Sequence, residues 1–292
     1  MPTLRWSIVT LTLAVMVAAT TLLQLAVVVQ STLLSPGFLM EVLENEGFFH
    51  ELPAAMGDWV AGLVDAQAIP RPLWEVISGT LRTIAEDAFS EDWTRAQARA
   101  YLEQLTGCVA RPGDHCTSLD LSPVRSRLVA TGAQYLSRPL LAWFEGAVDH
   151  ILPATFPVGQ VTSWPGLPAV SFLARVRPGL MVSLLAVQGL VLVLFAGLPG
   201  GTFLGGWGLA LASGLVLAWW GLATEWGPAL ILRLDLPSLP PGSPGPRELC
   251  LSLASAVLTA VRVQAAAGLK AGGGLMVGGL LLSNHHRRSP RL

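Results

Sequence analysis

The chain has 292 residues, of which 52% are hydrophobic and only 13% are charged, whereas soluble globular proteins carry about 25% charged residues. Its formal net charge is −1, so no basic field attracts nucleic acid, and we expect no nucleic-acid partner. The apolar residues form long runs, which is typical of a protein embedded in the lipid bilayer. The sequence predicts an all-α integral membrane protein with four transmembrane helices and an all-α extracytoplasmic domain between the first and second.

The first apolar run covers residues 7–30 and contains no charged residue. At 1.5 Å per residue it is long enough to cross a hydrocarbon core of about 30 Å. A cleavable signal peptide is the alternative, but its apolar region is only about 7–15 residues long. We therefore interpret residues 1–30 as an uncleaved signal anchor that forms transmembrane helix 1.

Residues 31–178 form the polar part of the chain, with 16 of the 19 acidic residues and ten arginines. Apolar residues recur there at helical spacing, which predicts four to six short helices. A serine cap followed by a proline in the first helical position marks two helix starts, at residues 35–36 and 122–123. We expect Gly47 and Gly107 to end helices.

The rest of the chain is apolar and is predicted to hold three further spans. Transmembrane helices 2 and 3 cover residues 179–198 and 203–224, joined by the short uncharged turn "PGGTFLGG". Residues 225–246 are predicted to form a proline-rich extracytoplasmic loop. Residues 247–283 read as one long helix containing transmembrane helix 4, and residues 284–292 as a basic cytoplasmic tail.

Four spans place both termini on one side of the membrane. Counts of arginine near the span ends are almost equal on the two sides, but the cluster of Arg287, Arg288 and Arg291 favours a cytoplasmic C-terminus. We therefore expect a multi-pass protein of the cell membrane with cytoplasmic N- and C-termini and an extracytoplasmic segment at 31–178.

Cys108 and Cys116 flank a polar, turn-rich stretch, and three interpretations apply to them. A metal site lacks the usual C-x-x-C pattern, and His115 beside Cys116 has poor geometry for joint ligation. Redox catalysis also normally uses C-x-x-C. We favour a structural disulfide, which needs only two sulfurs brought together by a turn. Because disulfides persist in oxidising compartments, this pair supports an extracytoplasmic location, and no metal or other cofactor is expected.

Few polar side chains interrupt the spans, the notable ones being Gln24, Gln188 and Lys270. An intramembrane lysine either snorkels toward the headgroups or faces other protein. Small residues four apart allow two helices to approach closely in lipid. The last span carries two such pairs, which are predicted to pack helices within the chain or between copies in a homo-oligomer: Gly268, Gly272, Gly274 and Gly278.

The sequence contains no recognisable catalytic motif: no G-x-S-x-G, H-E-x-x-H, P-loop or Rossmann fingerprint. Glu41, Glu44 and His50 could gather around a metal ion, but the solvated face of an amphipathic helix explains them, and we adopt that interpretation. We expect a protein that is not an enzyme.

Two features of the chain point to a group of similar proteins. One is the order of one span, a helical domain and three spans, and the other is a set of three stretches: "SPGFLMEVLENEGFF", "YLEQLTG" and "LDLSPVRSRL". The chain resembles a group of uncharacterised bacterial membrane proteins with four spans and a helical extracytoplasmic domain after the first. The likeness covers most of that domain and implies no activity. We expect a non-enzymatic envelope protein whose domain binds a partner or organises the cell surface; the alternative is a subunit of an oligomeric channel or transporter.

Overall fold

The computed structural model describes residues 2–63, 71–110, 118–152, 154–157, 167–231 and 246–288. The chain divides into two compact units. Unit 1 is made of residues 1–34, 169–232 and 254–292, and unit 2 of residues 35–168 and 233–253. The described chain is almost entirely helical.

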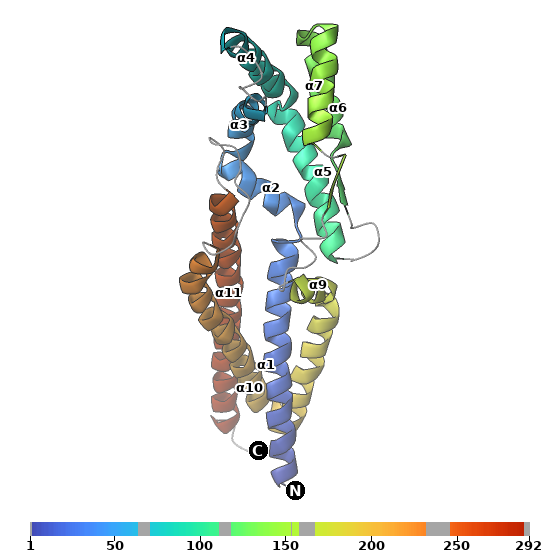
Figure 1. The fold of residues 1–292 in the computed structure, drawn as a ribbon. Coiled ribbons are helices and arrows are strands. Elements are labelled where there is room, and N and C mark those ends of the chain that lie inside the picture. The colour runs from blue at the N-terminus through green and yellow to red at the C-terminus, as the bar shows by residue number, and fades with distance from the viewer. Residues whose placement is uncertain are drawn as a thin grey trace. The chain divides into compact units, whose positions relative to one another are not determined.

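Unit 1 is built from long helices and the short helix α9 (Figure 1). They are α1 (Pro2–Ser31), most of α9 (Leu167–Arg175), α10 (Pro178–Ile231) and the larger part of α11 (Pro246–Arg288). Among the described residues, three helical segments are long and apolar enough to cross a membrane: Thr3–Ser31, Pro178–Trp226 and Glu248–His285. Their length and composition indicate a protein embedded in a membrane.

Helix α10 consists of two arms that reverse direction at Gly197 (Figure 1). Gly197 has φ 77° and ψ 164°, which is not helical. A Cβ placed on Gly201 would lie 2.5 Å from Val193 Cα, although residues eight apart in one continuous helix are separated by about 12 Å. The turn was predicted at residues 199–206, so it lies earlier than expected. Pro199 is tolerated after the reversal because the first turn of a helix leaves its N–H groups unpaired.

The second arm of α10 is also longer than predicted. The sequence suggested a loop from residue 225, but the helix continues past Pro228 to Ile231. Residues 232–245 of the predicted loop lie outside the described residues. The single long helix predicted at 247–283 is present as α11, which extends to Arg288.

Unit 2 contains six whole helices, the first residues of α11 and one pair of short strands among its described residues (Figure 1). The helices are α2 (Pro36–Asn45), α3 (Phe48–Leu63), α4 (Arg71–Ala88), α5 (Glu91–Ala110), α6 (Ser122–Tyr135) and α7 (Arg138–Ile151). The strands β1 (Ser118–Asp120) and β2 (Thr155–Pro157) are antiparallel, with Leu119 opposite Phe156.

The described chain is almost entirely helical, as predicted, and only this short strand pair was not expected. Three residues per strand are too few to show alternation in the sequence. The pairing is held from outside the strands, because Tyr101 Oη of α5 donates to the Asp120 carbonyl (2.8 Å) and Gln104 Nε2 donates to the Ser118 carbonyl (3.3 Å). Burial raises the pKa of Tyr101 above its usual value.

Some of the expected helix ends are confirmed and others are wrong. Ser35 caps α2 by accepting the Phe38 N–H at 3.3 Å, and Gly47, with φ 70°, follows its end. By contrast, Ser122 does not cap α6 with its side chain; the Asp120 carboxylate accepts its N–H at 2.9 Å. Gly107 does not end α5, which continues to Ala110, because an isolated glycine lowers helix stability by only about 1 kcal/mol.

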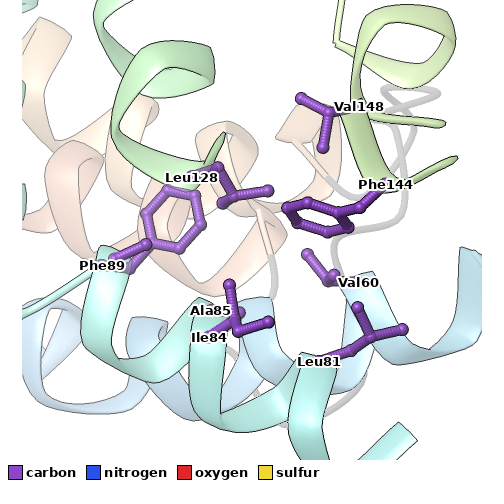
Figure 2. Packing of buried hydrophobic residues seen from close by; sticks show 9 residues of the cluster. Val60, Leu81, Ile84, Ala85, Phe89, Leu128, Phe144 and Val148 are labelled. Atoms are coloured by element: carbon purple, nitrogen blue, oxygen red, sulfur yellow. The ribbon is translucent and has the colours of Figure 1, made fainter. Parts of the chain in front are cut away.

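The core of unit 2 lies where α3, α4, α6 and α7 meet (Figure 2). Leu81 and Ile84 are fully buried, and Leu128 and Phe144 are almost so. The ring of Phe144 lies against Gly132, where a Cβ would come within 2.9 Å of it. The hydrophobic cluster comprises Val60, Leu81, Ile84, Ala85, Ala88, Phe89, Leu128, Phe144 and Val148. Trp93 at the start of α5 packs against this cluster, so the core holds one of the two helices that carry the charged surface described next.

Candidate functional site

A charged cleft of about 350 Å³ lies between α2 and α5 in unit 2. Residues from about two turns of α2 face residues from the first turns of α5 across it. Its lining consists of Gly37, Met40, Glu41, Glu44, Asp92, Arg95, Ala96 and Arg99. The spacing of these residues is helical: Glu41 and Glu44 are three apart, and Arg95 and Arg99 four apart, so each pair shares one face of its helix.

Arg95 joins the two walls of this cleft. Its Nε lies 2.9 Å from Glu44 Oε1 on α2, and its Nη2 lies 2.9 Å from Glu91 Oε1 on α5. Asp92 Oδ1 is 3.6 Å from Nη1, and the guanidinium lies over the ring of Phe49, 5.6 Å from its centroid. Several carboxylates and a π face therefore surround this arginine, which makes it a structural link between the helices.

Glu41 and Arg99 differ from Arg95 because neither makes an ion pair within the part of the chain that the structure describes. Both side chains are exposed and line the cleft, the acid on α2 and the base on α5. The cleft thus presents one negative and one positive group that are not engaged with each other. Such a surface can recognise a polar partner carrying complementary charges.

The end of α2 is held by the first turns of α11. Ser252 Oγ donates to Glu46 Oε1 at 2.7 Å, and both residues belong to unit 2. Cys250 on the same stretch is a half-buried free cysteine. This contact fixes the helix that forms one wall of the cleft.

The acids and histidine considered as metal ligands do not form such a site. Among the described residues, no group of three His, Cys, Asp or Glu side chains could hold a metal ion. Glu41 and Glu44 line the cleft, whereas His50 lies on α3 with an exposed side chain. The lining of the cleft instead combines acidic side chains of α2 and α5 with two arginines of α5.

Only one of the two cysteines predicted to form a disulfide can be placed. Cys108 lies in the last turn of α5, is half-buried and is not free. Cys116 lies outside the described residues. The bond between Cys108 and Cys116 stays a prediction.

The four glycines singled out on α11 fall on two different faces. A Cβ on Gly272 would lie 2.7 Å from the carbonyl oxygen of Gly206, and one on Gly268 would lie 2.3 Å from Ser213 Oγ. These two glycines pack against the second arm of α10. Gly274 and Gly278 have nothing within 4 Å of a Cβ position and face open space. Gly206 of α10, which lies against α11 at Gly272, was not predicted as a packing residue. Its position among other small residues could have indicated this role.

The polar side chains of the spans lie in different environments. Gln24 Nε2 donates to Ser213 Oγ at 2.8 Å, and both residues are buried. The buried oxygens Gln24 Oε1, Gln188 Oε1 and Thr20 Oγ1 have no hydrogen-bond partner in the described chain. Lys270 is exposed on α11. The pairing of Gln24 with Ser213 was missed because a single serine in an apolar run gives no sign of which helix it faces.

Comparisons of the chain with protein-family models, curated proteins and solved structures found no match.

Proposed function

We propose that this protein is a non-enzymatic, four-span membrane protein of the cell envelope whose helical domain binds a partner through the charged cleft. The observation that carries the proposal is the cleft itself. Glu41 and Arg99 line it from its two helices and form no ion pair in the described chain. Arg95 holds α2 to α5, so these two groups are presented on a fixed surface, which lowers the entropic cost of binding.

The reversal within α10 supports four spans. Each arm of α10 is apolar, and together with α1 and α11 the arms make four apolar segments. An even number of spans places both termini on one side, and the arginine cluster near the C-terminus favours the cytoplasm for that side. Residues 31–178 are then extracytoplasmic, which agrees with the predicted disulfide.

The test is chemical crosslinking in intact membranes followed by affinity purification and mass spectrometry. Wild-type protein is compared with Arg99→Glu, which reverses the positive charge in the cleft. We expect a discrete set of crosslinked proteins on wild type that is depleted on Arg99→Glu, because a like-charge contact at an interface is unfavourable.

The matched control is Arg127→Glu, an exposed arginine of α6 that does not line the cleft. It makes the same charge change in the same unit, so it should retain the wild-type set. Equal depletion by both variants, or no difference between Arg99→Glu and wild type, would contradict the cleft as the contact surface.

A second candidate function is that of a subunit in a larger membrane assembly, such as an oligomeric channel or transporter. The observation that favours it is the outer face of α11, where exposed Lys270 precedes Gly274 and Gly278, which face open space. Small residues there leave room for another helix. The particle mass in mild detergent and ion flux in liposomes test this function; a monomer without flux would contradict it.

A further inference from the structure

A second cavity, of about 620 Å³, lies in unit 1 where α10 reverses. α1 contributes one side, and the two arms of α10 contribute the other. The lining residues are Arg5, Trp6, Val9, Phe195, Ala196, Gly200, Phe203 and Leu204. The cavity is apolar apart from a single cationic side chain, and its volume falls in the range of about 300–1,000 Å³ found for ligand sites.

Arg5 is fixed at this cavity by the end of the first arm of α10. Its Nε donates to the carbonyl oxygen of Phe195. The last carbonyls of a helix have no partner within the helix, so a basic side chain there satisfies one of them. This contact uses one N–H of the guanidinium. The two terminal nitrogens, which can bind an anion in a bidentate manner, have no partner among the described residues.

The location of the cavity points to its ligand. A reversal between two apolar arms that cross a bilayer has to lie near a membrane surface, where lipid headgroups are found. Trp6 is 67% exposed beside Arg5, and tryptophan favours this interface. A cation at the mouth of an apolar crevice suits an amphiphile with an anionic headgroup and an acyl chain.

We propose that this cavity binds an acidic phospholipid from the surrounding leaflet. The lipid phosphate pairs with the terminal nitrogens of Arg5, and one acyl chain lies along Trp6, Phe195 and Phe203. The site rests on the insertion of unit 1 in the membrane and is independent of the charged cleft in unit 2. The alternative is that Arg5 serves only to cap the first arm of α10. That role uses only its Nε and does not explain the apolar cavity beside it.

The experiment uses full-length protein reconstituted in nanodiscs of equal phosphatidylglycerol and phosphatidylcholine. The protein is then released in mild detergent, and native mass spectrometry counts the lipids retained. Wild type should retain phosphatidylglycerol over phosphatidylcholine. Arg5→Lys keeps the charge but cannot bind the phosphate in a bidentate manner while it holds the Phe195 carbonyl, so it should retain only part of that preference. Arg5→Gln should lower that preference by about fivefold to tenfold, the size expected for one cation near a headgroup.

Two further variants keep the result interpretable. Ala196→Phe fills the cavity and leaves Arg5 in place, so it should reduce the number of both lipids retained. Arg177→Gln removes an exposed arginine that does not line the cavity, and it should leave the lipid preference unchanged. If Arg5→Gln fails to fold, as shown by circular dichroism, Ala196→Phe decides the question.

Three results would overturn the proposal. They are equal retention of the two lipids by wild type, a loss in Arg177→Gln as large as that in Arg5→Gln, and full retention by Ala196→Phe. Displacement of the lipid by millimolar inorganic phosphate would also count against it, because the acyl chain would then contribute nothing to binding.

Discussion

Gly268 leaves no space for a side chain where α11 meets α1 and the second arm of α10. A Cβ there would lie 2.3 Å from Ser213 Oγ and 2.4 Å from Gln24 Nε2. These two atoms belong to a buried hydrogen bond, so they cannot separate without leaving polar groups unpaired.

We predict that Gly268→Ala destabilises unit 1 by about 1–3 kcal/mol, the usual cost of overpacking a well-packed site. The matched control is Gly274→Ala on the same helix, where a Cβ has nothing within 4 Å. It should be neutral or slightly stabilising, since alanine is the better helix former. Thermal unfolding in mild detergent measures both. Similar melting temperatures for the two variants would contradict this packing.

Gly197 is the residue at which α10 reverses, and its φ of 77° with ψ of 164° lies in a region used almost only by glycine. We predict that Gly197→Ala costs about 1–3 kcal/mol, because the new side chain strains the backbone. Gly214→Ala, in the same helix with open space around its Cβ position, is the control. The measurement is again the melting temperature in detergent. An unchanged value for Gly197→Ala would mean that the reversal does not need this conformation.

At the scale of the element, the start of α6 depends on a side chain outside the helix. The Asp120 carboxylate accepts both the N–H and the hydroxyl of Ser122, and these two hydrogen bonds lower the pKa of Asp120 below its usual value. A lowered pKa in the folded state means that the carboxylate stabilises the fold above the ordinary aspartate pKa of 3.8. This contribution is lost as the pH falls through the lowered value.

We therefore predict that Asp120→Ala lowers the melting temperature at pH 7 and has a smaller effect at strongly acidic pH, where wild type has already lost the charged cap. Asp120→Asn keeps an acceptor oxygen, so its melting temperature at pH 7 should lie between those of wild type and Asp120→Ala. Thermal melts followed by circular dichroism at neutral and acidic pH provide the comparison. An equal loss from Asp120→Ala at both pH values would show that the charge is not involved.

The sequence predicted which segments of the chain are helical, but it did not predict where several of the helices begin or end. The Ser35–Pro36 start is local: the cap and its N–H partner lie three residues apart, so spacing reveals it. The start of α6 involves Asp120, which lies in a strand paired with residues more than 30 positions later. The contact between Asp120 and Ser122 is itself local, two residues apart, but the strand that contains Asp120 forms only in the tertiary fold, and the sequence pattern pointed to Ser122 instead.

Long-range contacts also limited what could be said of the candidate sites. The glycine spacing on α11 indicated close packing, but it did not distinguish Gly272, which meets α10, from Gly278, which faces open space. Likewise, the acids of α2 were read as a solvated face, because nothing in the sequence brings Arg95 and Arg99 of α5 opposite them. Which residue a side chain contacts on another helix can be identified only from the packed structure.

At the scale of the whole molecule, the membrane arrangement and the cysteine chemistry are linked. If residues 31–178 are extracytoplasmic, Cys108 and Cys116 lie in an oxidising compartment and should be bonded. Cys250 is free and serves as the internal reference. The loop closed by Cys108 and Cys116 is short, so its contribution to stability should be below the roughly 3 kcal/mol expected for a 15-residue loop.

We predict that protein purified without reductant takes up one alkyl group, on Cys250, under denaturing conditions, and three after reduction. Intact-mass analysis measures both numbers. Replacing Cys108 and Cys116 together by serine should lower the melting temperature and leave membrane insertion intact, because insertion depends on the apolar helices of unit 1. Cys250→Ser is the matched control and should leave the melting temperature nearly unchanged. Alkylation of all three cysteines without reduction would contradict the disulfide, and the main support for an extracytoplasmic location of residues 31–178 would be lost with it.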